Sequence, residues 1–155
     1  YLRGYDVKGV YGMETWKPKN PEEYLLYQYC SNLKGNLFLE VPVGNKEWGN
    51  WPPKTKIRRI DGVFVFNEEA DGFKAYMRQD YTINEFYKQI QGRKVELIEV
   101  KKSLNRLVVG QVIAGMDMFE RQYGTNKVIP VILCHIGDPA LEWVCERRNI
   151  KVYII

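Results

Sequence analysis

Two charged residues interrupt a hydrophobic segment in the middle of the chain. The segment "VELIEVKKSL" spans residues 95–104, and Glu99 and Lys101 lie two positions apart within it. In a strand these two side chains share one face, because successive side chains alternate. Apolar residues on both faces predict a central strand, where an unpaired charge is costly. Glu99 and Lys101 therefore form either a structural ion pair or part of a site that requires them.

A second acid lies in another apolar segment. Asp61 belongs to "IRRIDGVFVF" at 57–66, and it would meet Glu99 at one edge of a sheet if the two strands pair antiparallel. Carboxylates held that close repel each other unless a cation lies between them, and oxygen ligands suit Mg²⁺ or Mn²⁺. The backbone carbonyl of Val100 could add a ligand. Lys101 could orient a water for attack on a phosphate, or stabilise the negative charge that develops there.

One alternative leaves Asp61 without such a role. Asp61-Gly62 between two apolar runs is also a strong signal for a hairpin turn, and a turn at this point would bind no metal.

Helices and strands alternate regularly around these residues. The predicted helices are 20–34, 82–92, 103–123 and 138–149, and the predicted strands are 36–43, 57–66, 95–101, 127–135 and 150–155. This order predicts an α/β protein with a mixed β-sheet, in which an antiparallel meander leads into right-handed β-α-β units with helices on both faces. We expect a single domain over 1–155, with an N-terminal segment at 1–19 and an insertion at 67–93.

The arrangement resembles the PD-(D/E)XK nuclease superfamily, the restriction-endonuclease-like fold of many restriction enzymes and archaeal Holliday junction resolvases. The resemblance rests on Asp61, on Glu99-Val100-Lys101, and on the long helix that follows, in α-β-β-β-α-β-α-β order over residues 20–155. It implies that Asp61 and Glu99 bind Mg²⁺ or Mn²⁺ and that Lys101 is the catalytic lysine. The implied activity is a metal-dependent deoxyribonuclease acting on duplex or branched DNA.

Two features depart from the family pattern. Ile60 stands where the proline of the family name would be. In addition, 37 residues separate Asp61 from Glu99, which requires the segment 67–93 to be an insertion.

The two long helices supply further candidates. Gln111 falls on the side of helix 103–123 that is defined by Leu104, Leu107, Val108, Val112, Gly115, Met118 and Phe119. Several superfamily members have a glutamine in this helix facing the site, but an amide hydrogen-bonded inside the core is an alternative. In the first helix Glu22 projects nearer the apolar stripe than Glu23, which can form a capping box with Asn20. We therefore assign Glu22 to the site and Glu23 to the cap, with Glu40 as a weaker acidic candidate.

Basic and aromatic residues lie next to the predicted site. The residues predicted to contact nucleic acid are Lys54, Lys56, Arg58, Arg59 and Lys102. A solvated strand end is the alternative for the basic run. Trp48 and Trp51 could stack on bases, or could pack their loop onto the domain.

Composition excludes several classes of protein. The 155 residues, 45% apolar, can form a core without disulfides or metals, and the net charge of +4 permits nucleic acid as a partner. Cys30, Cys134 and Cys145 form no Cys-x-x-Cys pair, which disfavours zinc and iron–sulfur sites and indicates reduced thiols in a cytoplasmic protein. His135, the single histidine, is expected to be a hydrogen-bonded boundary residue. No apolar run approaches the length of about 18 residues that a membrane span needs.

The ends of the sequence also carry an expectation. The first residues do not resemble a signal peptide and lack Met, and the last ones look like a strand, so we expect a trimmed chain with a continuation after residue 155.

The leading prediction is an endo- or exonuclease that hydrolyses DNA phosphodiester bonds, with assembly into a homodimer left open. The alternative is a nuclease-fold protein that has lost catalysis and serves as a nucleic-acid-binding or assembly module. An α/β small-molecule module is disfavoured, because no glycine-rich phosphate loop follows a strand.

Overall fold

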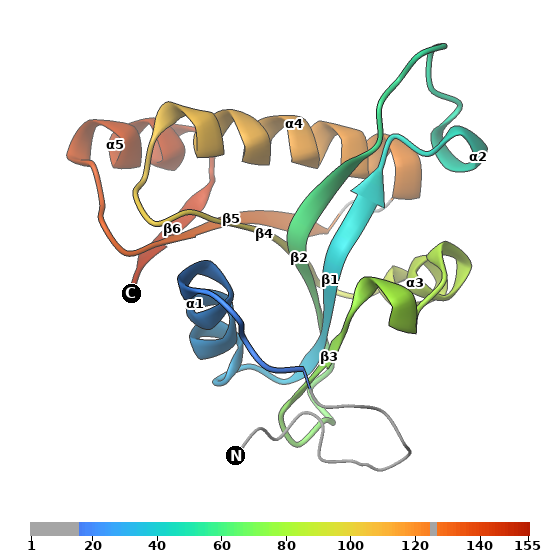
Figure 1. Cartoon of the computed structure of the whole chain (residues 1–155), viewed down its shortest axis with the longest axis horizontal. Helices are drawn as coiled ribbons and strands as arrows, with labels where there is room; N and C mark the ends of the chain where they lie inside the picture. The colour runs from blue at the N-terminus through green and yellow to red at the C-terminus, as the bar shows by residue number, and fades with distance from the viewer. Residues whose placement is uncertain (1–15, 125–126) are drawn as a thin grey trace.

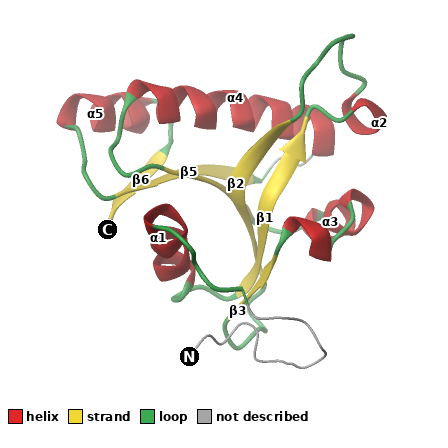
Figure 2. Cartoon of the chain, viewed as in Figure 1, coloured by secondary structure: helices red, strands yellow, loops and turns green. Residues whose placement is uncertain are grey.

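One mixed sheet of six strands, in the order β3-β1-β2-β4-β5-β6, organises the chain (Figures 1 and 2). The structure, a computed structural model, describes residues 16–124 and 127–155. The strands are β1 (Gly35–Val43), β2 (Arg58–Phe66), β3 (Phe73–Tyr76), β4 (Val95–Val100), β5 (Val128–Cys134) and β6 (Lys151–Ile154). The helices are α1 (Pro21–Cys30), α2 (Lys46–Gly49), the 3₁₀ turn η2 (Arg78–Asp80), α3 (Ile83–Ile90), α4 (Arg106–Tyr123) and α5 (Pro139–Arg147).

Antiparallel pairs lie in the middle of the sheet, and parallel pairs lie on either side of them. β1 pairs antiparallel with β2, and β2 pairs antiparallel with β4. β4, β5 and β6 are parallel, and α4 and α5 form the two crossovers between them. The predicted α/β class, with a mixed sheet built from a meander and β-α-β units, is therefore confirmed.

Helices cover both faces of the sheet, so that a separate core lies on each side. α4 and α5 lie over one face and α1 lies against the other (Figure 1). The first core contains Phe86 of α3, Val112 and Phe119 of α4, and Cys145 of α5. The second core forms around Leu26 of α1. β2 and β4 are central in the sheet and covered on both faces. Their apolar side chains therefore pack into one core or the other.

Three sequence predictions about elements were wrong. No helix or strand was predicted in the stretch 67–81, but it contains η2 and the edge strand β3, which pairs parallel with β1. None was predicted in the stretch 44–54 either, but it contains the single-turn helix α2. α4 begins at Arg106 rather than at residue 103, because Asn105 caps it by accepting a hydrogen bond from the Val108 N–H at 2.9 Å. Of the N-terminal segment predicted at 1–19, residues 1–15 lie outside the described part of the chain.

The apolar side of α4 is narrower than its sequence indicates. Val108, Val112 and Phe119 are fully buried, whereas Leu107 is 61% exposed. Leu107 lies in the first turn of α4, which borders a cleft. The Leu107 side chain lines that cleft and is not part of the core. The prediction that Leu107 belongs to the buried stripe was therefore wrong.

Candidate active site

The register between β2 and β4 brings two acids together. Gly62 pairs with Ile98 and Val63 pairs with Leu97, so the next position along the two strands places Asp61 opposite Glu99. One carboxylate oxygen of Asp61, Oδ2, accepts a hydrogen bond from the Val100 N–H at 2.9 Å. The predicted meeting of Asp61 and Glu99 is confirmed. The hairpin alternative is excluded, because Asp61 and Gly62 lie inside the strand β2.

The pKa values of both carboxyl groups are raised. Glu99 is only 6% exposed, and burial, followed by the charge of Asp61 and a hydrogen bond to it, raises the Glu99 pKa to about 9. The Asp61 carboxyl reaches solvent but has protein around most of it, and this desolvation raises its pKa, while hydrogen bonds from Val100 and Glu99 lower it. Glu99 is the more enclosed of the two, and its pKa lies well above the ordinary range of a carboxyl group.

Lys101 follows Glu99 on a segment that is held in place by β5. The backbone N–H of Lys101 donates to the Leu133 carbonyl at 3.0 Å. The backbone carbonyl of the following residue, Lys102, accepts from the N–H groups of His135 and Ile136. The Lys101 charge lowers the pKa values of both acids. Within the described residues no ion pair joins Glu99 to Lys101, so the structural alternative of a closed Glu99–Lys101 ion pair does not describe this site.

A distortion of the backbone opens the sheet beside Asp61. Glu40 of β1 lies opposite Asp61 and has a φ of +52°, a left-handed conformation that is rare for a residue with a side chain. On β1, Phe38 and Val41 pack into the same core although they are three residues apart, so the normal alternation of the strand shifts at Glu40. The shift lets the side chains of Glu40 and Asp61 line the same cavity on the α1 side. Nothing in the sequence indicated this conformation.

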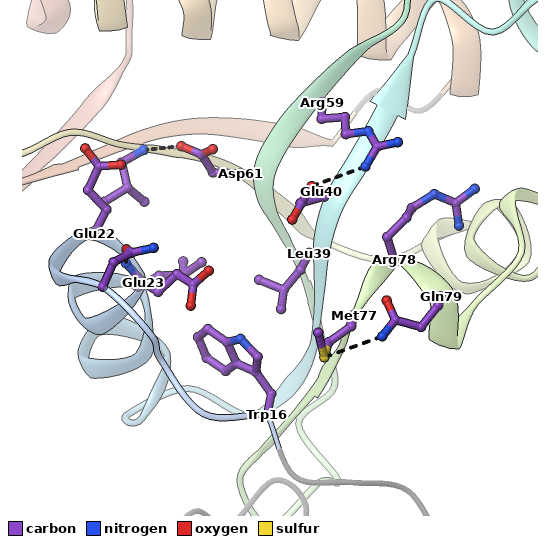
Figure 3. A pocket seen from close by; sticks show the side chains of 13 residues that line it. Trp16, Glu22, Glu23, Leu39, Glu40, Arg59, Asp61, Met77, Arg78 and Gln79 are labelled. Carbon is purple, nitrogen blue, oxygen red and sulfur yellow. Dashed lines mark hydrogen bonds and ion pairs between the residues drawn. The ribbon is translucent and has the colours of Figure 1, made fainter.

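The cleft at Asp61 has two lobes. The α4 lobe, of about 590 Å³, lies beneath the first turns of α4 and is lined by Arg58, Ile60, Glu99, Lys101, Arg106 and Gln111. The α1 lobe, of about 370 Å³, lies between α1, β1 and η2 and is lined by Trp16, Glu23, Leu39, Glu40, Met77 and Gln79 (Figure 3). Glu22, Arg59, Asp61 and Val100 line both lobes. Asp61 therefore stands where the two lobes join.

Helix α1 separates the roles of its two acids. The Glu23 N–H donates to Asn20 Oδ1 at 2.9 Å, and Glu23 Oε1 accepts from the Lys19 N–H at 2.8 Å. Glu23 thus stabilises the start of α1, but the predicted capping box is only half formed, because the Glu23 side chain accepts from Lys19 and not from the N-cap Asn20. Glu22 is half-buried and lines both lobes beside Asp61.

Gln111 lies at the cleft and not in the core. Gln111 is exposed, and it lines the α4 lobe together with Lys101 and Glu99. The alternative of an amide buried and hydrogen-bonded in the core is therefore wrong. Its placement on the apolar side of the helix was also wrong, although Gln111 does line the same lobe as Glu99 and Lys101.

The basic residues divide into two groups. Arg58 and Arg59 line the cleft, whereas Lys54 and Lys56 are exposed in the preceding loop and line neither lobe. Lys102 is exposed and lines a shallow groove beside Glu22 and His135. Arg106, in the first turn of α4, lines the α4 lobe and was missed by sequence reasoning. Its position directly after the N-cap Asn105 was the signal that would have identified it.

The aromatic loop before β2 packs onto the domain. Trp51 Nε1 donates to Gln122 Oε1 at 3.0 Å, and the Arg121 guanidinium lies 4.4 Å from the Trp51 ring centroid. Trp48 packs against Tyr87 of α3 at 5.3 Å. The alternative that these tryptophans fix their own loop is confirmed, and they do not contribute to the cleft.

The remaining sequence candidates are structural. All three cysteines are free and buried, and His135 Nδ1 lies 2.7 Å from the Ile155 carbonyl oxygen, as expected of a boundary residue.

Within residues 16–124 and 127–155 there is no group of three or more His, Cys, Asp or Glu side chains arranged to hold a metal. No helix in the same residues is both long and apolar enough to cross a membrane.

Comparison of the chain with protein-family models, with curated proteins and with solved structures found no match. The residues of this site are therefore the basis for inferring a function.

Proposed function

We propose that this protein is a metal-dependent nuclease that hydrolyses DNA phosphodiester bonds on a restriction-endonuclease-like fold. The observation that carries the proposal is the meeting of Asp61 and Glu99 at the floor of a cleft. Lys101 follows on the same strand, and Arg58 and Arg106 line the lobe above it. Acids at the floor and cations around them suit a phosphate whose charge must be held during attack.

The donor set suits a small divalent cation. Two carboxylates and one carbonyl are hard oxygen ligands, and Mg²⁺ commonly takes one or two carboxylates and keeps several waters. Asp61, Glu99 and the Val100 carbonyl are the groups that would hold Mg²⁺ or Mn²⁺. The raised pKa of Glu99 supports the same position, because a cation between the two carboxylates would relieve the repulsion from Asp61 that contributes to the rise. When bound, such an ion supplies a water of lowered pKa and neutralises charge on the phosphate.

The chain itself supplies the other contributions. Lys101 orients the attacking water or stabilises the charge that develops on the phosphate, since a protonated ammonium cannot act as a metal ligand. Gln111 hydrogen-bonds the same water or a phosphate oxygen from the opposite wall of the α4 lobe. Glu22, at the junction of the lobes, can accept a proton from a water. Arg58, Arg59 and Arg106 hold the neighbouring phosphates.

The test is a cleavage assay with labelled linear duplex, branched and single-stranded DNA in the presence of Mn²⁺. We expect Lys101→Ala to lower the cleavage rate about 100-fold or more while DNA affinity is largely retained, because its contribution lies in the transition state. Lys88→Ala is the matched control, since Lys88 is exposed on α3 and lines neither lobe.

A catalytically inactive nucleic-acid-binding or assembly module is the second candidate. It is favoured by the lack, in the described residues, of a third acid grouped with Asp61 and Glu99. If the wild type binds DNA but cuts none of the substrates with Mg²⁺ or Mn²⁺, this second function replaces the first.

A further inference from the structure

The two lobes of the cleft differ in charge. Among the described residues, the α4 lobe is lined by three carboxyl groups and four cationic side chains. The α1 lobe is lined by four carboxyl groups and only two guanidinium groups. A phosphate backbone is therefore attracted to the α4 lobe and repelled from the α1 lobe.

Both guanidinium groups of the α1 lobe are already bonded to the protein. Arg59 Nη1 lies 3.3 Å from Glu40 Oε1. Arg78 Nη1 donates to the Tyr81 carbonyl at 2.7 Å, and its guanidinium lies over the Tyr81 ring at 5.0 Å from the centroid. These bonds make the lobe still less suitable for a phosphate, because each cation already has a partner.

Apolar side chains form one part of the wall of the α1 lobe, and charged and amide side chains form the rest. Trp16, Leu39 and Met77 line it from three segments of the chain, with Glu40 and Gln79 also at its wall (Figure 3). Its volume of about 370 Å³ falls within the range of about 300 to 1,000 Å³ that is usual for small-ligand pockets. A nucleobase, which is about as large as a tryptophan indole, fits such a space.

We propose that the α1 lobe holds one unpaired nucleobase of the DNA strand whose phosphate lies at Asp61. This inference rests on the proposed function, because Asp61 is the point at which the two lobes join. The apolar wall contacts the face of the base, as in other proteins that hold bases outside a duplex. Glu40 and Glu22 are acceptors for the exocyclic amino group of cytosine, adenine or guanine.

An unpaired base in the α1 lobe determines which DNA the protein prefers as a substrate. A base in the α1 lobe cannot be paired at the same time, and extrusion of a paired base costs a few kcal/mol. The preferred DNA therefore carries an unpaired nucleotide beside the cleaved phosphate, as an overhang, a flap or a bulge. Uninterrupted duplex DNA is a poorer substrate.

The experiment compares DNA that carries an unpaired base with DNA that lacks the base at the same position. Three duplexes carry one unpaired cytidine, as a 5′ overhang, a 3′ overhang or a bulge, and each has a partner with an abasic residue at that position. Dissociation constants are measured with the Lys101→Ala protein, and cleavage with Mn²⁺ is measured with the wild type. We expect at least one cytidine duplex to bind about tenfold more tightly than its abasic partner, the magnitude of one stacked base.

A variant connects that difference to the lobe. Gln79→Trp places a large side chain at the wall of the α1 lobe and should bring the cytidine-to-abasic ratio close to one. Gln91→Trp is the matched control, because Gln91 is also exposed but lines neither lobe. Equal affinity for cytidine and abasic DNA in all three pairs overturns the inference, as does a preference that Gln79→Trp leaves intact. Failure of the proposed function is distinct, because the wild type would then cut no DNA while the binding ratios still decide what occupies the lobe.

Discussion

At the scale of single residues, the raised pKa of Glu99 has a consequence for stability. Burial and the charge of Asp61 raise the Glu99 pKa from an ordinary 4.5 to about 9. Between these values the folded protein binds a proton that the unfolded chain releases, so stability is complete below about pH 4.5 and falls as pH rises toward 9. Without a divalent cation, wild-type stability should therefore decline over this window.

Glu99→Gln removes this titration, because a glutamine amide stays neutral at every pH. Without metal, we expect the variant to be as stable as the wild type at pH 6 and more stable at pH 9, by on the order of 2 kcal/mol. Urea unfolding at several pH values measures the difference, and Glu120→Gln, at an exposed position of α4, should leave the profile unchanged. A loss of several kcal/mol in Glu99→Gln at pH 7 would contradict the raised pKa of Glu99 and indicate an essential ion pair with Lys101.

At the scale of elements, one glutamine connects α4 to the loop before β2. Gln122 is 6% exposed, and its Oε1 accepts from the Gly44 N–H at 2.7 Å and from Trp51 Nε1. Its Nε2 donates to the Pro42 carbonyl and to Asn45 Oδ1. The amide therefore joins the end of β1 to the loop that leads into Arg58.

Gln122→Ala should destabilise the protein by about 2 to 4 kcal/mol, because buried N–H groups lose their acceptor. Denaturant unfolding measures this, and Gln111→Ala is a matched control from the same helix. Since Gln111 is exposed, its replacement should change the free energy of unfolding by less than about 0.5 kcal/mol. Equal losses in the two variants would show that the loop does not depend on Gln122.

The elements also show what the sequence could and could not predict. The pairing of β2 with β4 was predictable, because each is an apolar segment that carries a candidate site acid, Asp61 or Glu99. Placing the two acids opposite each other specifies the register. β3 was not, since its four residues gain their hydrogen bonds from β1, distant in sequence. The positive φ of Glu40 and the role of Gln122 were equally hidden, because both arise from contacts between segments rather than from local pattern.

At the scale of the whole molecule, a metal bound only by the folded state must raise stability. With free Mn²⁺ at 100 times its dissociation constant, we expect a gain of about 2.7 kcal/mol, visible as a higher melting temperature. Asp61→Asn should abolish both this gain and the heat of binding in calorimetric titration, while its amide oxygen can still accept from the Val100 N–H. Unchanged Mn²⁺ binding in Asp61→Asn would place the metal elsewhere.

The distribution of basic residues over the molecule predicts how DNA binding depends on salt. Arg58 lines the α4 lobe and, among the described residues, bonds only the backbone carbonyl of Lys56, whereas Arg59 is partly neutralised by Glu40. Each phosphate contact adds about 0.9 to the slope of log K against log salt concentration. Arg58→Ala should therefore lower the slope by about 0.9 for every DNA sequence, and Arg59→Ala should lower it by less.

Lys54 and Lys56 supply the comparison, because they are exposed but lie outside both lobes. If the DNA backbone follows the α4 lobe, the double variant Lys54→Ala, Lys56→Ala should change the slope less than Arg58→Ala does alone. Fluorescence anisotropy titrations over a range of salt concentrations measure all these slopes, with Lys88→Ala on α3 as the neutral control. A larger change from the lysine pair than from Arg58 would move the bound DNA out of the cleft and onto the loop, away from Asp61 and Glu99.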